Sequence, residues 1–85
     1  MNIKELFDQA VTDSKLLPKD PSNEVLLKLY ALFKQSEVGD INIETPANVF
    51  DFVARAKYEA WLEMKGKSKE AAMQGYVDLV NSLKG

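Results

Sequence analysis

Apolar residues recur at the spacing of one helix face in four separate segments of the chain. These segments predict helices over residues 3–16, 22–37, 52–65 and 68–83. The residues expected to face the core recur three and four positions apart: Ile3, Leu6, Phe7, Ala10 and Val11 in the first helix, Val25, Leu26, Leu29, Leu32 and Phe33 in the second, and Ala72, Met73, Tyr76, Val77, Val80 and Leu83 in the fourth. The pattern predicts an all-α protein, a four-helix bundle.

The expected ends of these helices coincide with residues that favour helix boundaries. The segment "LLPKDPSN" contains two prolines, which interrupt the first helical pattern. Ser22 and Ser68 are expected to be the N-caps of the second and fourth helices. Gly39 is expected to end the second helix in a left-handed turn, and Gly66 to end the third. Gly75 lies inside the fourth helix, where glycine costs about 1 kcal/mol relative to alanine; a close contact with another helix would explain it.

The segment "VGDINIETPANVF" between the second and third helices has no helical pattern. Most helix–helix connections in bundles are shorter, and loops of this length are often functional. At about 3.3 Å per residue, the segment is long enough to return along a whole helix. The second and third helices can therefore run parallel, with this loop as a long crossover.

The composition restricts the possible functions of the chain. Its 85 residues predict one domain, 1–85, and they include neither cysteine nor histidine. Disulfides, thiolate metal sites and most nucleophile–base pairs are thereby excluded, so we expect no enzyme activity and no metal. A net charge of −2 argues against nucleic-acid binding. The sequence "MNIKELFDQA" lacks a signal-peptide pattern, and no apolar run is long enough for a membrane span, so we expect a cytoplasmic protein without stable membrane insertion. Its small size suggests a monomer.

Two predicted helices carry more apolar surface than a single packing face requires. In the second helix, Leu27, Tyr30 and Lys34 lie together just beyond the core stripe. In the third helix, apolar residues cover more than half of the circumference, and Lys57 falls inside this arc, one turn before Trp61. Such lysines either extend their ammonium groups to water along apolar neighbours or hold an anionic ligand, because leaving an ammonium desolvated and unpaired is costly.

The other two helices add a hydroxyl and a cation. Tyr76 lies at the centre of the apolar face of the fourth helix and is either a core tyrosine with a backbone partner or a ligand contact. Lys15 lies at the flank of the first helix, where an ordinary surface lysine is the alternative. Together these residues suggest an apolar groove with cations and hydroxyls at one end. That composition suits a ligand with an anionic head and a long apolar tail.

Two segments, "YALFKQSEVGDINIETP" and "RAKYEAWLEMKGKSKEAAMQGYVDLV", resemble the acyl-coenzyme A-binding protein family in order and spacing. The resemblance implies an up-down-down-up four-helix bundle that binds medium- to long-chain fatty acyl-CoA esters without chemistry, as a carrier and pool former in lipid metabolism. Family members often carry a lysine where this chain has Val53. The ligand-binding residues that the resemblance implies are Lys15, Tyr30, Ala31, Leu32, Phe33, Lys34, Lys57 and Tyr76.

Two other functions compete with acyl-CoA binding. The same groove can dock a partner helix, with Tyr58, Trp61 and Met64 as its anchors. A small enzyme that uses a carboxylate pair on the polar face is the second alternative, which the lack of histidine and cysteine disfavours.

Overall fold

The computed structural model describes residues 2–17 and 21–84, and within these ranges it contains four α-helices and no strand. The helices are α1 (Ile3–Ser14), α2 (Asn23–Glu37), α3 (Phe52–Leu62) and α4 (Lys69–Leu83). The predicted all-α class is confirmed, although α1 and α3 end two and three residues earlier than the sequence pattern suggested. Of the two prolines expected to interrupt the first helix, Pro18 lies outside the described residues.

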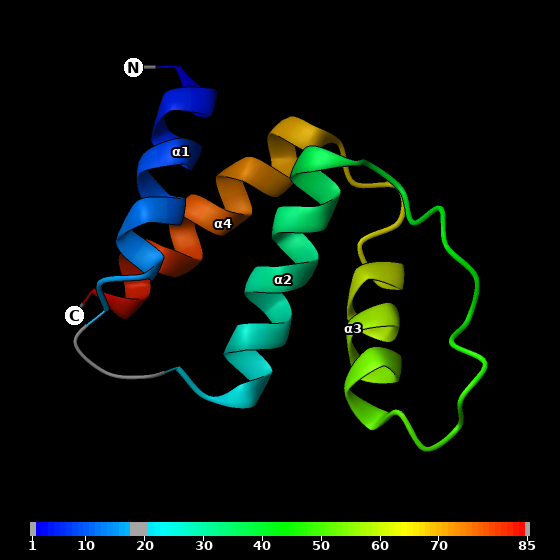
Figure 1. Cartoon of the computed structure of the whole chain (residues 1–85). Helices are drawn as coiled ribbons and strands as arrows, with labels where there is room; N and C mark the ends of the chain where they lie inside the picture. The colour runs from blue at the N-terminus through cyan, green and yellow to red at the C-terminus, as the bar shows by residue number, and fades with distance from the viewer. Residues whose placement is uncertain (1, 18–20, 85) are drawn as a thin grey trace.

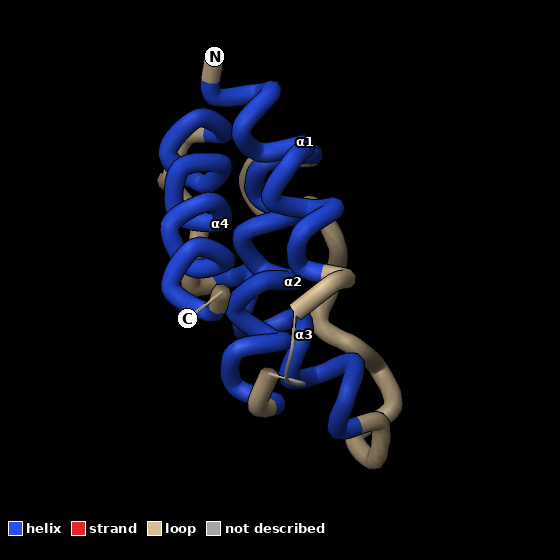
Figure 2. The backbone as a smooth tube through the Cα atoms, turned by 90° about the vertical axis from the view of Figure 1, so that its left-hand side faces the viewer, coloured by secondary structure: helices blue, strands red, loops and turns tan. Residues whose placement is uncertain are grey.

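The helices follow the up-down-down-up order that the sequence implied. Figure 1 shows α2 and α3 running in one direction, and α1 and α4 running in the other. The segment 38–51 descends beside α3 to reach its N-terminus, so it is the long crossover that parallel neighbours need (Figures 1 and 2). Helix α4 packs against both α1 and α2, whereas α3 packs against α2 alone. One long face of α3 is therefore left without a helical neighbour.

The predicted caps and turns are present. The Ser22 hydroxyl accepts a hydrogen bond from the Val25 amide (3.3 Å), and the Ser68 hydroxyl accepts one from the Ala71 amide (3.0 Å). Gly39 has a φ of 94°, a backbone conformation that favours glycine and that turns the chain away from α2.

Gly75 lies where α4 packs closely against α2. A Cβ atom at this position would lie 3.1 Å from Cδ2 of Leu32, closer than side chains normally pack. Leu32 is itself 4% exposed, so it has little room to move aside. The expected explanation for a glycine inside this helix, a close helix contact, is therefore confirmed.

The main core lies between α1, α2 and α4. Its buried residues are Phe7, Ala10, Leu29, Leu32, Ala72, Tyr76, Val77 and Val80. Two residues predicted for the core of α2 are more exposed than expected: Leu26 is 49% and Phe33 37% accessible. They lie seven residues apart on one edge of the predicted stripe, away from the buried residues Leu29 and Leu32.

A buried polar cluster, which the sequence pattern did not predict, joins the C-terminal ends of α2 and α3. The Gln35 side chain is fully buried, and its amide donates to the Asp40 carboxylate (2.9 Å) and to the Lys67 carbonyl (2.7 Å). Its carbonyl oxygen accepts from the Trp61 indole (3.2 Å). The Asp40 carboxylate also accepts from the Gly66 amide (2.8 Å). This Gln35 cluster fixes the positions of α2 and α3 relative to the turn before α4.

Candidate ligand-binding groove

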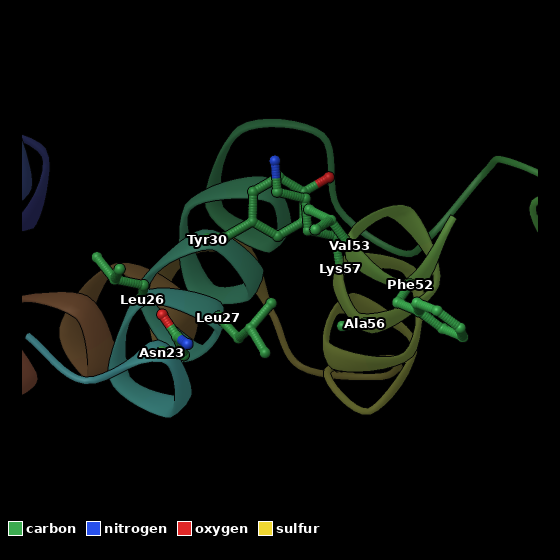
Figure 3. Close-up of a pocket in the computed structure, with 8 residues that line it drawn as sticks. All are labelled: Asn23, Leu26, Leu27, Tyr30, Phe52, Val53, Ala56 and Lys57. Atoms are coloured by element: carbon green, nitrogen blue, oxygen red, sulfur yellow. The ribbon is translucent and has the colours of Figure 1, made fainter. Parts of the chain in front are cut away.

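An apolar groove of about 370 Å³ lies between α2 and α3. Helix α2 contributes Asn23, Leu26, Leu27 and Tyr30, and α3 contributes Phe52, Val53, Ala56 and Lys57. Figure 3 shows Leu27 and Val53 projecting into the space between the helices, with Tyr30 and Lys57 close together at one end. We call this space the first groove. It has apolar walls, with a phenol and an ammonium group at that end.

Lys57 lies over the ring of Tyr30, with Nζ 5.4 Å from the ring centroid. This distance is typical of a cation–π contact, which holds an ammonium without neutralising its charge. Lys57 is exposed and Tyr30 is half-buried. The contact crosses from α3 to α2 at the polar end of the first groove, whereas the helical pattern had placed Lys57 next to Trp61 on its own helix.

Lys34 lies one turn beyond Tyr30 and makes a similar contact with Trp61. Its Nζ atom is 5.1 Å from the Trp61 ring. The ring is held rigidly, because the indole N–H donates to the Gly39 carbonyl (3.0 Å) as well as to Gln35. Trp61 is only 1% exposed. The alternative in which Trp61 anchors a partner helix is therefore wrong for this residue, which supports a cation instead.

Two other lysines of the chain have carboxylate partners. Lys4 contacts Asp8 (3.2 Å), and Lys84 contacts Asp13 (2.6 Å). The hydrogen bond from Lys84 is the main reason why the pKa of Asp13 is below its usual value. In contrast, neither Lys34 nor Lys57 has a carboxylate within 4.0 Å among the described residues. Their charges are therefore available to an anion.

Tyr76 belongs to an aromatic cluster on the other side of α2. Its ring lies 5.2 Å from that of Phe7 and 6.5 Å from that of Phe33, and the Phe7 and Phe33 rings are 6.0 Å apart. Tyr76 is 5% exposed, and its hydroxyl donates to the Ser14 hydroxyl (3.2 Å). The hydroxyl thus has a partner within the protein, a side chain rather than the expected backbone carbonyl.

The remaining predicted site residues occupy different environments. Lys15 is exposed at the C-cap of α1, next to Ser14. Ala31 and Leu32 are 0% and 4% exposed, so their side chains pack inside the protein. The structure therefore brings Tyr30, Lys34 and Lys57 together along α2 and α3, and it holds Lys15 and Tyr76 near the end of α1. Their roles in binding a ligand remain predictions.

A second groove, of about 280 Å³, also lies between α2 and α3. Its apolar residues are Leu27, Ala31, Ala60 and Met64, and its charged residues are Glu24, Lys28 and Glu63. Leu27 lines both grooves. The sequence indicated Leu27 as apolar surface and placed Ala60 and Met64 in the wide apolar arc of the third helix, but it did not indicate that they would line a second groove.

Neither a membrane span nor a metal cluster is found in the described part of the chain. Within residues 2–17 and 21–84, no helix has both the length and the hydropathy needed to cross a bilayer. The same residues contain no group of three or more acidic side chains placed to hold a metal ion.

Comparison with known proteins identifies the family. A sequence model described as "Acyl CoA binding protein" matches residues 4–80. This chain belongs to the acyl-CoA-binding protein family. The match covers α1 apart from its first residue, all of α2 and α3, and most of α4, and it includes both grooves and the residues around them.

Individual members of the family are similar over most of the chain. The Acyl-CoA-binding protein homolog 1 of Caenorhabditis elegans is 49% identical over 77 residues, which are 91% of this chain and 88% of that protein. The crystal structure of Oryza sativa Acyl-CoA-Binding Protein 2 superposes with a TM-score of 0.90 at 39% identity, covering 96% of this chain and 90% of the other.

A longer human protein named Enoyl-CoA delta isomerase 2 is 52% identical over 77 residues. That match covers 91% of this chain but only 19% of the isomerase. The chain thus spans about a fifth of the length of this curated relative, and the similarity lies in the part that corresponds to the acyl-CoA-binding fold.

Proposed function

We propose that the chain binds medium- to long-chain fatty acyl-CoA esters and acts as a carrier and pool former for them. The observation that carries the proposal is the pair Lys34 and Lys57, two cations held on aromatic rings without carboxylate partners among the described residues. They lie beside an apolar groove. A ligand with phosphates at one end and an alkyl chain at the other matches both features, and membership of the family supports the same ligand.

The head group would interact mainly with charged and aromatic side chains. In this proposal, Lys34, Lys57 and Lys15 contact the phosphates of CoA through charge-assisted hydrogen bonds. The exposed edge of Phe33 and the ring of Tyr30 provide aromatic surface for the adenine. Ala31 and Leu32 are buried, so they would act by packing, and Tyr76 would act from its place beside Phe33.

The acyl chain would lie on the apolar walls of the first groove. Burial of one methylene group contributes about 0.8 kcal/mol. A sixteen-carbon chain would therefore contribute on the order of 10 kcal/mol before the costs of ordering are subtracted. Neither free CoA nor free palmitate uses both parts of the site, so each should bind far more weakly than palmitoyl-CoA.

We further propose that the protein acts by binding alone, as a single acyl-CoA-binding domain over residues 1–85. The absence of histidine and cysteine from the sequence supports this, since most nucleophile–base pairs require one of them. The proposed ligand needs no cofactor. A cytoplasmic monomer without nucleic-acid binding or stable membrane insertion agrees with the net charge of −2 and with the helices described above.

Calorimetric titration of the chain with palmitoyl-CoA, CoA and palmitate tests the proposal. We expect palmitoyl-CoA to bind at least about 100-fold more tightly than either fragment, because head and tail contribute together. Equal affinity for palmitate and palmitoyl-CoA would contradict the role of the lysines. Mass spectrometry of the recovered ligand is expected to find it intact, and hydrolysis would contradict binding without chemistry.

A further inference from the structure

Four large apolar side chains are exposed together where the crossover enters α3. They belong to Val49, Phe50, Phe52 and Val53, and Phe50 is the most exposed of them at 79%. We call these four residues the apolar tip. Figures 1 and 2 place the N-terminus of α3 at an end of the molecule, and Figure 3 shows the Phe52 ring pointing away from α2. Apolar patches of this kind on a small protein often mark a surface that meets a partner or a membrane.

Hydrogen bonds of the backbone hold the apolar tip in this exposed arrangement. The Asp51 amide donates to the Asn48 carbonyl (3.1 Å), which closes a turn with Val49 and Phe50 at its two central positions. The Phe50 amide donates to the Asn48 side chain (2.9 Å), and the Ala54 amide donates to the Asp51 side chain at the N-cap of α3 (3.0 Å). Such turns ordinarily carry glycine, proline or polar residues. The turn therefore does not itself require two apolar side chains.

The size and shape of the apolar tip argue against a stable protein partner. The exposed parts of its four side chains amount to roughly 400 Å². A stable protein–protein interface, including that of a dimer, buries about 800 Å² on each partner. The tip also lies on a turn at an end of the molecule, whereas a partner helix docks in a groove. A lipid surface needs neither a large flat interface nor a groove.

The charges near the apolar tip indicate which kind of lipid surface it suits. Residues 41–54 include two carboxylates, those of Glu44 and Asp51, and no lysine or arginine. Across the first groove, α2 contributes the uncharged residues Asn23 and Leu26. Anionic lipid surfaces attract clusters of lysine and arginine, which the tip lacks. Its composition therefore suits a zwitterionic lipid such as phosphatidylcholine.

We propose that the apolar tip docks the protein reversibly on zwitterionic phospholipid bilayers, with Val49 and Phe50 entering the boundary between head groups and acyl chains. This inference goes beyond the proposed function and does not depend on it. The docking is reversible, because the tip offers no more apolar surface than a single fatty-acyl anchor, which alone gives only marginal membrane binding. Phe52 and Val53 also line the first groove, so the docked protein presents that groove to the lipid.

Sedimentation of the protein with vesicles of palmitoyl-oleoyl phosphatidylcholine, in the absence of acyl-CoA, tests the proposal. Phe50→Ser is expected to lower the partition coefficient at least about fivefold, and Val49→Ser with Phe50→Ser at least about tenfold. Leu16→Ser is the matched control, because Leu16 follows α1 and is 75% exposed; it is expected to change the coefficient less than about twofold. Neither Val49 nor Phe50 lines a groove, so both tip variants should bind palmitoyl-CoA in solution as wild type does.

Tryptophan fluorescence locates the contact. The one natural tryptophan, Trp61, is buried and provides a constant background. A tryptophan introduced by Phe50→Trp is expected to be quenched by vesicles of brominated phosphatidylcholine, whereas one introduced by Leu16→Trp is not. Replacement of a third of the lipid by phosphatidylserine should not strengthen binding.

Several results would overturn the docking proposal. These are the absence of vesicle binding by wild type, equal losses in Phe50→Ser and Leu16→Ser, and stronger binding to vesicles that contain phosphatidylserine. A wild-type dimer in sedimentation equilibrium that Phe50→Ser dissociates would assign the apolar tip to a second copy of the chain instead. None of these results affects the titration with palmitoyl-CoA in solution, so failure of this inference is distinguishable from failure of the proposed function.

Discussion

Replacement of Gln35 by leucine is expected to destabilise the protein strongly, although leucine fits the helix and has a similar size. Gln35 is fully buried, and its side chain makes three hydrogen bonds, with Asp40, Lys67 and Trp61. Leucine makes none of them. The Lys67 carbonyl would lose its short contact of 2.7 Å, whereas Trp61 would keep a bond to Gly39.

The size of the loss follows from these contacts. A hydrogen bond contributes about 1 kcal/mol net, and a buried group left without a partner costs somewhat more. Three lost bonds, one of them compensated in part, predict a loss of about 2–3 kcal/mol in the free energy of unfolding. The total stability of a chain of this size is about 4–13 kcal/mol. The melting temperature is therefore expected to fall by about 10–20 °C.

Urea and thermal unfolding followed by circular dichroism measure this effect. The matched control is Gln74→Leu, because the Gln74 amide also bonds to a carboxylate, that of Asp78 (2.8 Å), but on the exposed surface of α4. The control is expected to change the free energy of unfolding by no more than about 0.5 kcal/mol. Equal effects of Gln35→Leu and Gln74→Leu would refute the reasoning that the buried cluster holds α2 and α3 together.

Two further substitutions test neighbouring parts of the fold. Hydrogen bonds, from the Gly66 amide first and the Gln35 side chain second, lower the pKa of Asp40 below its ordinary value of 3.8. The stability that the ionised Asp40 provides is present above that pH and is lost as the pH falls through the lowered pKa. Asp40→Asn should therefore reduce the loss of unfolding free energy between pH 6 and pH 3, and an unchanged loss would exclude Asp40 as a source. Gly75→Ala should lower the melting temperature, because overpacking against Leu32 costs about 1–3 kcal/mol. This cost exceeds the helix propensity that alanine gains over glycine, about 1 kcal/mol. A higher melting temperature would contradict the close contact.

The positions of the helices and their caps could be predicted from the sequence because they depend on local signals. The Ser22 cap bonds to an amide three residues away, and Gly39 adopts its left-handed conformation within one turn of the helix end. The edge formed by Leu27, Tyr30 and Lys34 could also be recognised, since helical periodicity places these residues together. Local information therefore located much of the candidate site.

The Gln35 cluster could not be predicted in the same way. Gln35 bonds to residues 26 and 32 positions later in the chain, and only the packing of α2 on α3 brings them together. A glutamine at this position of a helix ordinarily faces solvent. The sequence placed Trp61 in the apolar arc of the third helix, but it did not indicate which polar group would meet its indole.

The exposure of the α3 region likewise depends on how the helices pack. The apolar arc of the third helix was recognised as too wide for one neighbour, and the structure leaves Phe52 73% and Val53 64% exposed. This results from α3 packing against α2 alone. The same arrangement produces the two grooves, which became evident only from the structure.

The central claim is that Lys34 and Lys57 hold the phosphates of acyl-CoA, and calorimetric titration of their alanine variants with palmitoyl-CoA tests it most directly. Each substitution is expected to weaken binding at least about tenfold, the effect of one lost charge-assisted hydrogen bond, while the melting temperature changes little. Lys67→Ala is the control, because Lys67 is an exposed lysine that lines neither groove. Weaker binding by the first two variants and wild-type binding by the third would support the account. Wild-type affinity in both Lys34→Ala and Lys57→Ala would contradict it.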